Sequence, residues 1–172
     1  MSRTRRAHAY VGLGANLADP RRKVEAALTA IATLPHTRLV RHSSLYRSAP
    51  WGVADQPEFV NAAAQIETAL SPPELMQALL GIERDFGRER SGDRWGPRVI
   101  DLDLLVYADR VIDEPGLHVP HPHLHERAFV LVPLAEIAPG LEVPGKGPVS
   151  GLLAQIDASA CRLLEPGAPA TG

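Results

Sequence analysis

The order of the strands and helices that the sequence predicts restricts the fold more than any other feature. Strand-forming stretches occur at residues 8–14, 37–47, 58–68 and 98–107. Apolar residues at helical spacing predict one helix between the first two strands and another between the last two. Strand, helix, strand, strand, helix, strand is the split βαβ pattern of ferredoxin-like folds. We therefore expect an α+β domain whose mostly antiparallel sheet carries helices packed on one face.

Local signals indicate where these elements begin. Asp19 and Pro20 are typical of an N-cap followed by the first residue of a helix. Ser71 and Glu74 have the spacing of a capping box, which predicts the start of the second helix. Beyond the last of the four strands we expect a short edge strand within 111–119, a helix over 125–138 and a short helix over 149–157.

Length and composition place the chain among ordinary globular proteins. Its 172 residues suit one domain, which we expect at 8–160, between a flexible segment at 1–7 and a disordered tail at 161–172. No apolar run is long enough to span a bilayer, and the basic N-terminus lacks the apolar core of a signal peptide. A net charge of −2 gives no general attraction to nucleic acid or membranes. We expect a cytoplasmic monomer.

The strand predicted at 98–107 carries two aspartates on one face. Asp101 and Asp103 alternate with apolar residues, so their side chains leave the same side of the strand, roughly 6.5 Å apart. Such a pair can bind one or two Mg²⁺ ions, which take one or two protein carboxylates and complete their coordination with substrate phosphates. A solvated strand face is the alternative. Asp is depleted in strands, and like charges on one face repel, which favours the functional interpretation.

A polar, glycine-bearing loop at 87–97 precedes the aspartates. Arg90 lies within it and Arg98 directly follows it, and arginines beside a carboxylate pair suggest an anionic substrate bound together with a metal. Salt bridges within the loop are the alternative, and we prefer that interpretation for the other arginines of this region. Trp95 either closes over a substrate with the loop or pins the loop to the core.

Four histidines lie between residues 118 and 125. They lack the HExxH arrangement, and no cysteine is near them, so a zinc site is disfavoured. His121 and Arg127 are better interpreted as donors to a phosphate or nucleotide. His123 and His125 are expected at the surface.

Two aromatic side chains and one side-chain amide are candidates for contacts with a ligand. Phe59 and Asn61 share a strand face by the period of two, and Phe129 belongs to a later helix. Two aromatic rings and one amide can hold a flat heterocycle, by stacking on its faces and hydrogen bonding to its edge. Ordinary core packing of the two phenylalanines is the alternative.

Together these segments resemble one family, the hydroxymethyl-dihydropterin pyrophosphokinases of folate biosynthesis. The resemblance is collinear over residues 8 to 155, and its most specific block is Arg-Trp-Gly-Pro-Arg-Val-Ile-Asp-Leu-Asp at 94–103. Further matches are Gly-Leu-Gly-Ala-Asn-Leu at 12–17, Asp-Gln-Pro-Glu-Phe-Val-Asn-Ala-Ala at 55–63 and Glu-Arg-Ala-Phe-Val-Leu-Val-Pro-Leu at 126–134. The resemblance implies Mg²⁺-dependent transfer of the terminal diphosphate of ATP to the hydroxymethyl group of a reduced pterin, with release of AMP.

The resemblance also implies roles for individual residues. The catalytic residues would be Arg90, Arg98, Asp101 and Asp103, with both aspartates binding two Mg²⁺ ions. The ATP site would be lined by Glu83, Arg90, Arg98, Leu104, His121 and Arg127. The pterin site would be formed by Phe59, Asn61, Trp95 and Phe129, with backbone groups around Ser48 and Trp51.

Two other classes of protein remain as alternatives. A ligand-binding regulatory module with the same fold would not need a metal pair beside an arginine. A histidine-based metal-binding protein would retain structural zinc after chelation, whereas Mg²⁺ would wash out. The residues do not single out a general base, and Asp101, Asp103 or water can take the proton of the attacking hydroxyl.

Overall fold

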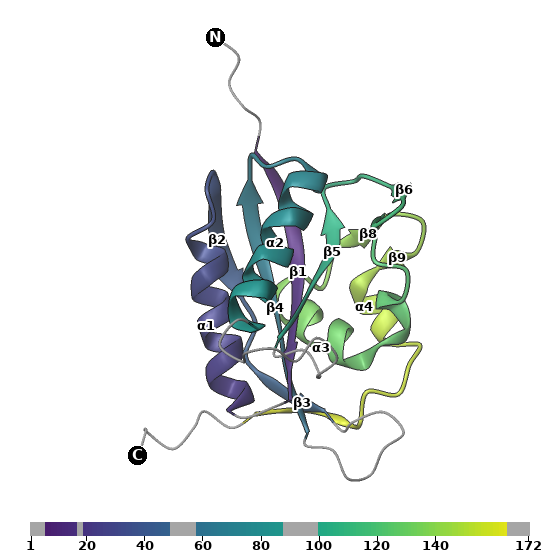
Figure 1. Ribbon diagram of the computed structural model, residues 1–172. Helices are drawn as coiled ribbons and strands as arrows, with labels where there is room; N and C mark the ends of the chain where they lie inside the picture. The colour runs from purple at the N-terminus through teal and green to yellow at the C-terminus, as the bar shows by residue number, and fades with distance from the viewer. Residues whose placement is uncertain (1–5, 17–18, 49–57, 88–99, 165–172) are drawn as a thin grey trace.

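The computed structural model describes residues 6–16, 19–48, 58–87 and 100–164, and all structural statements refer to them (Figure 1). The strands of the main sheet are β1 (Ala7–Ala15), β2 (Thr37–His42), β3 (Tyr46–Ser48), β4 (Phe59–Thr68), β5 (Asp101–Tyr107) and β10 (Cys161–Leu163). The helices are α1 (Pro20–Ala32), α2 (Pro72–Gly87), α3 (Ala128–Ile137) and α4 (Val149–Leu153), with a 3-10 turn at Leu124–Glu126. Two small hairpins pair β6 (Ile112–Glu114) with β7 (Leu117–Val119) and β8 (Glu142–Val143) with β9 (Gly147–Pro148).

The main sheet confirms the predicted ferredoxin-like topology. Its strand order is β10-β3-β4-β1-β5, and β2 also pairs with β4. Every pairing between the described strands is antiparallel. The helix α1 follows β1 and α2 follows β4, as the split βαβ pattern requires. The stretch at 111–119 forms a separate hairpin, β6–β7, instead of an edge strand of this sheet.

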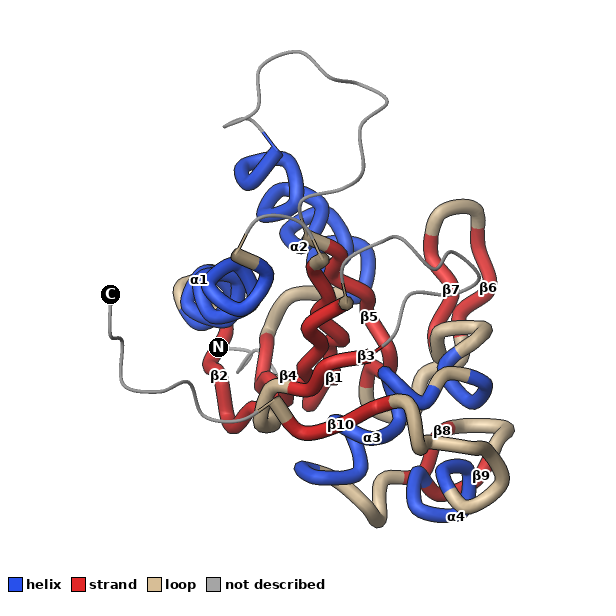
Figure 2. The backbone as a smooth tube through the Cα atoms, turned by 90° about the horizontal axis from the view of Figure 1, so that it is seen from below, coloured by secondary structure: helices blue, strands red, loops and turns tan. Residues whose placement is uncertain are grey.

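Helices cover both faces of the sheet, so the prediction that they pack on one face is wrong. Figure 2 shows the sheet between α1 and α2 on one side and α3 and α4 on the other. Odd-numbered residues of β1 from Ala9 to Ala15 belong to the core under α1 and α2, whereas Tyr10 packs with α3 and α4. The cause is that α3 is apolar on nearly all sides, with Val130, Leu131 and Leu134 buried, and must be covered by the sheet.

The strand predicted at 37–47 is interrupted at Ser43. Its backbone N–H donates to the carbonyl of Ala63, and its hydroxyl accepts the N–H of Ala63. A side-chain oxygen thus replaces a backbone carbonyl, and the strand is divided into β2 and β3, which both pair with β4. This break brings the short strand β3, with Ser48 at its end, against the start of β4.

The two predicted helix starts have different outcomes. Ser71 and Glu74 form the capping box, since each backbone N–H donates to the side chain of the other residue. Asp19 does not cap α1 with its side chain, because its backbone is left-handed, with φ 55° and ψ 56°. Pro20 still begins α1 as predicted.

The sheet continues past the predicted end of the domain. Cys161–Leu163 form β10, which pairs with β3, and the N–H of Leu164 donates to the carbonyl of Leu45. The prediction of a disordered tail from residue 161 is therefore wrong for residues 161–164, because backbone hydrogen bonds hold them to the sheet. Their partner β3 would otherwise leave its outer edge unpaired.

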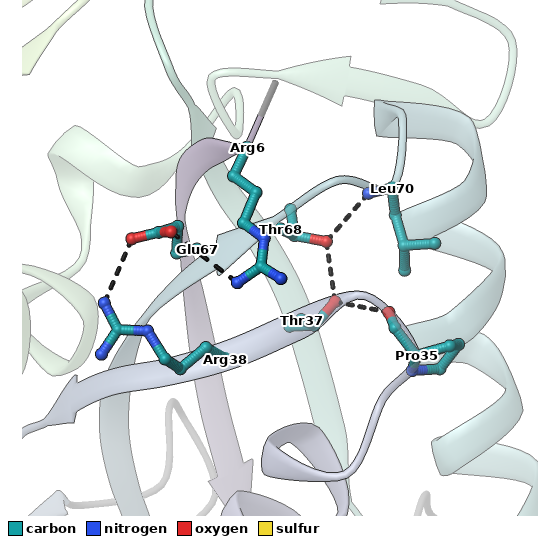
Figure 3. Close-up of polar contacts among 7 residues, drawn as sticks. All are labelled: Arg6, Pro35, Thr37, Arg38, Glu67, Thr68 and Leu70. Atoms are coloured by element: carbon teal, nitrogen blue, oxygen red, sulfur yellow. Dashed lines mark hydrogen bonds and ion pairs between the residues drawn. The ribbon is translucent and has the colours of Figure 1, made fainter. Parts of the chain in front are cut away.

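The end of β4 far from β3 is fixed by a pair of threonines. The Thr37 hydroxyl donates to the carbonyl of Pro35, and the hydroxyls of Thr37 and Thr68 lie 2.7 Å apart (Figure 3). Thr68 also accepts the N–H of Leu70. Glu67, which precedes Thr68 in β4, forms ion pairs with Arg6 and Arg38 (Figure 3). This end of the sheet is a structural anchor, remote from β3.

Candidate active site

The site is built around two glycines of β1. Gly14 is paired with Asn61 of β4 on one side and with Asp101 of β5 on the other. Gly12, two residues earlier in β1, is paired with Asp103 of β5. All of these residues point to the sheet face opposite α1 and α2, because strand side chains alternate. Because Gly12 and Gly14 have no side chains, β1 leaves an open trough over the sheet between the amide of Asn61 and the two carboxylates.

A cavity of about 510 Å³ occupies this trough. It contains predicted residues from both halves of the site, since Asn61 and the two aspartates line the same space. Its other lining residues are Gly12, Leu13, Gly14, Ser48, Phe59, Ala62, His123, Glu126, Arg127, Phe129 and Val130. A space of this size suits a small organic ligand.

Asp101 and Asp103 are half-buried in the cavity wall, so their carboxylates are not on a freely solvated strand face. No group of three or more His, Cys, Asp or Glu side chains within the described ranges is placed to bind a metal. Two carboxylates nevertheless fit Mg²⁺, which retains waters and uses phosphate oxygens from its substrate. The donor set therefore fits an ion that arrives with a phosphorylated ligand.

Glu83 links α2 to the aspartate strand. Its Oε2 accepts the backbone N–H of Leu102 at 2.7 Å. Leu102 stands between Asp101 and Asp103, so this contact fixes the strand segment that presents both carboxylates. Leu104, also predicted at the nucleotide site, has its side chain in the core under α1 and α2, which leaves its backbone as the part that can face a ligand.

His121 lies close to the carboxylate pair but is not among the residues that line the cavity. Its backbone N–H donates to the carbonyl of Leu105, and its Nδ1 accepts the N–H of His123 at 3.1 Å. Burial lowers the pKa of His121, and the nearby charge of Asp103 opposes this shift in part. A neutral ring whose Nδ1 accepts must carry its proton on Nε2. His121 is thus a neutral hydrogen-bond donor.

The predicted heterocycle slot is assembled at the other end of the trough. Phe59, Asn61 and Phe129 all line the cavity, together with Ser48. The Ser48 hydroxyl donates to Oδ1 of Asn61 at 2.7 Å, and both residues are buried. The Arg127 guanidinium carbon lies 5.6 Å from the centre of the Phe129 ring, a cation–π contact.

Four predicted site residues, Trp51, Arg90, Trp95 and Arg98, lie outside the described residues, so their places in the site stay predictions. Conversely, the cavity includes residues that the sequence did not identify. His123 is exposed as expected, yet it lines the cavity, where its Nδ1 lies 3.2 Å from Oε2 of Glu126. Gly12 and Gly14 had a usable signal, because glycines within a strand mark a close approach of another group.

The comparison with known families agrees with this geometry. Residues 10–139 match the family described as 7,8-dihydro-6-hydroxymethylpterin-pyrophosphokinase (HPPK). The chain belongs to this family. A relative from Pseudomonas aeruginosa, named 2-amino-4-hydroxy-6-hydroxymethyldihydropteridine pyrophosphokinase, is 52% identical over 145 residues, which is 84% of this chain and 89% of the relative. Relatives of the same name from Haemophilus influenzae and Bacillus subtilis are 47% and 40% identical, over 86% and 78% of this chain and 91% and 80% of their own.

Solved structures agree on the fold. The wild-type HPPK-DHPS of Plasmodium falciparum superimposes with a TM-score of 0.70 at 13% identity, over 87% of this chain. This chain spans 44% of the length of that protein. Separately, the helices in the described part of the chain include none with the length and apolarity needed to cross a membrane.

A carboxylate in α3 supports the slot from outside. Glu136 accepts hydrogen bonds from the Tyr46 hydroxyl at 2.6 Å and from the backbone N–H and hydroxyl of Ser44 at 3.0 Å. Burial alone would raise the pKa of Glu136, but these hydrogen bonds outweigh it and hold the pKa below its usual value. Glu136 therefore ties α3, which carries Phe129, to β3, which carries Ser48.

Replacing Glu136 with glutamine should lower the free energy of unfolding by about 1 kcal/mol at neutral pH, as expected for an exposed group with charge-assisted hydrogen bonds. Because the pKa of Glu136 is lowered in the folded state, its contribution is present above the ordinary carboxyl pKa and is lost as pH falls through the folded pKa. Urea unfolding at neutral and acidic pH should therefore show a difference between wild type and Glu136→Gln that disappears in acid. Glu142→Gln, at an exposed position of β8, is the control, and an equal effect there would contradict this assignment.

Proposed function

We infer that the chain transfers the pyrophosphoryl group of ATP to the hydroxymethyl group of 6-hydroxymethyl-7,8-dihydropterin, giving the pterin diphosphate and AMP. This reaction is a step of tetrahydrofolate biosynthesis. The observation that carries the inference is that one cavity joins the carboxylate pair of β5 to the aromatic and amide slot of β4 and α3. A binding module would need the slot but not the carboxylates.

Asp101 and Asp103 are proposed to hold Mg²⁺, most simply two ions, as the phosphates of ATP enter the trough. A metal held by these two carboxylates would supply neutralisation of the phosphate charge. Glu83 fixes the strand between the aspartates through the N–H of Leu102, so both carboxylates keep their direction during the reaction. The pterin oxygen then attacks the β-phosphorus, its proton is released to a carboxylate or water, and AMP leaves.

Arg127 and His121 are proposed to contact ATP. Arg127 lines the cavity with its charged end over Phe129, and His121 offers a neutral Nε2–H. Both groups can donate to phosphate oxygens. Arg90 and Arg98 are proposed to stabilise the charge that develops in the transition state, and Trp95 to cover the substrates. The support for these last three is the match of the 94–103 block and of Arg90 to the family.

The pterin is proposed to lie between Phe59 and Phe129, with its polar edge toward Asn61. This proposal is supported by the two aromatic side chains and the buried amide that line one cavity, groups that can stack on a heterocycle and hydrogen bond to its edge. Backbone groups near Ser48 and Trp51, and the ring of Trp95, are proposed to complete it.

The direct test is to incubate the protein with ATP, Mg²⁺ and 6-hydroxymethyl-7,8-dihydropterin and to follow nucleotides and pterins by chromatography. We expect equal amounts of AMP and pterin diphosphate, and no product without Mg²⁺. Release of ADP in place of AMP would contradict pyrophosphoryl transfer. Pterin binding without any product would instead favour a regulatory module.

Gly14→Ala should weaken pterin binding about tenfold, in line with the loss of one or two hydrogen bonds. A Cβ at this position would lie 2.9 Å from Nδ2 of Asn61, so the amide would have to move. In Gly12→Ala the nearest atoms would be carbons of Leu105 at 3.4 Å, which is tolerable. Calorimetric titration with pterin should therefore show a clearly larger loss for Gly14→Ala than for Gly12→Ala, and the reverse order would contradict the close contact.

A further inference from the structure

The side-chain amide of Asn61 is held in one orientation. Ser48 and Asn61 are only 6% and 5% exposed, so water competes little for the hydrogen bond between their side chains. The Ser48 hydroxyl donates to Oδ1 of Asn61. The amide nitrogen, Nδ2, lies on the other side, over Gly14 at the floor of the cavity. The amide thus presents its N–H donors beside Gly14 and directs its oxygen to Ser48.

Ser48 makes this orientation the favourable one. The terminal torsion of asparagine is broad and nearly two-fold, so an unrestrained amide can turn by half a rotation. After such a turn the NH₂ group would face Ser48 and could donate to its Oγ, but an NH₂ group cannot accept the hydroxyl proton. The proton of the buried hydroxyl would then lose the acceptor that Oδ1 gives it, which carries a free-energy penalty. The Ser48 hydroxyl therefore selects the state in which Asn61 donates to the cavity.

The position of Ser48 is itself fixed on both sides. In β3 it is paired with Phe59 of β4 and with Cys161 of β10. The strand β10 lies beyond residues 10–139, the part of the chain that matches the family. Backbone pairing on both edges keeps the hydroxyl within reach of Asn61.

We propose that Ser48 is a positioning residue that orients the Asn61 amide, so that the site selects heterocycles with a hydrogen-bond acceptor at the edge facing Nδ2. This proposal rests on the proposed function, because it takes a pterin as the ligand. It assigns the Ser48 side chain a role that differs from a direct backbone contact with substrate. Ser48 acts through Asn61 and needs no contact with the reacting atoms.

The test compares Ser48→Ala, Ser48→Thr and Asn61→Asp. Ser48→Ala should raise the dissociation constant and KM for the pterin about tenfold, the effect of one lost buried hydrogen bond, and leave KM for ATP unchanged. Ser48→Thr keeps the hydroxyl and should restore pterin binding. Asn61→Asp still accepts from Ser48 but has no N–H donor, so it should lose pterin binding despite its nearly identical shape.

Thr68→Ala is the matched control, because it removes another buried, hydrogen-bonded hydroxyl, at the opposite end of β4 (Figure 3). It should lower stability without changing either KM. Wild-type pterin affinity in Ser48→Ala or Asn61→Asp, or an equal loss in Thr68→Ala, would overturn the proposal. If Ser48→Ala does not fold, Asn61→Asp and Ser48→Thr still decide. Failure of the proposed function would look different, since wild type would then form no AMP.

Discussion

Replacing either Asp101 or Asp103 with alanine is expected to reduce turnover by about three orders of magnitude, the scale of several kcal/mol of transition-state stabilisation supplied through a metal. Both carboxylates project from β5 into the cavity, where the phosphates of ATP are proposed to enter. Removing one would leave a single carboxylate to hold the proposed Mg²⁺. The measurement is the rate of AMP formation at saturating Mg²⁺, with both substrates in excess.

The fold should survive these changes. The aspartates are half-buried on the cavity side, and relief of repulsion between two like charges offsets the loss of their other contacts. Asp109→Ala, in the exposed turn after β5, is the matched control and should keep full activity. Near wild-type turnover in Asp101→Ala or Asp103→Ala at ordinary Mg²⁺ would refute the carboxylate-pair assignment.

Asn61→Ala is expected to weaken pterin binding about a hundredfold while changing ATP binding little, because sites built on hydrogen bonds to a ligand edge are the most sensitive to loss of one partner. The Asn61 amide lies beside Gly14 of β1. Gly14 separates it from the carboxylates, because Gly14 is paired with Asn61 on one side and with Asp101 on the other. Calorimetric titration with each ligand alone measures the two affinities. Equal losses for both ligands would contradict a dedicated pterin contact.

The same variant also tests the scaffold. Loss of Asn61 leaves the buried hydroxyl of Ser48 without its acceptor, so some stability should be lost with the affinity. Thermal unfolding without ligand measures this part. The double variant Ser48→Ala with Asn61→Ala should be no weaker in pterin binding than Asn61→Ala alone, because Ser48 acts through the amide.

Local patterns in the sequence were sufficient for the main helices, for most strands of the main sheet and for the chemistry of single residues. Period-two alternation placed Asp101 and Asp103 on one face of β5, and the capping box of Ser71 and Glu74 located the start of α2. These features depend on neighbours in the chain, so the sequence contains them directly. The family resemblance then supplied the activity, which the match over residues 10–139 supports.

Tertiary structure decided how these residues come together. Register in the sheet, not spacing in the chain, sets Gly14 between Asn61 and Asp101, which joins the amide and the carboxylates in one trough. The division of the strand at Ser43, the helices on the second face and the added edge strand β10 depend on hydrogen bonds and apolar surfaces far apart in sequence. The orientation of the Asn61 amide depends in the same way on Ser48, a hydroxyl on the neighbouring strand that no local pattern connects to it.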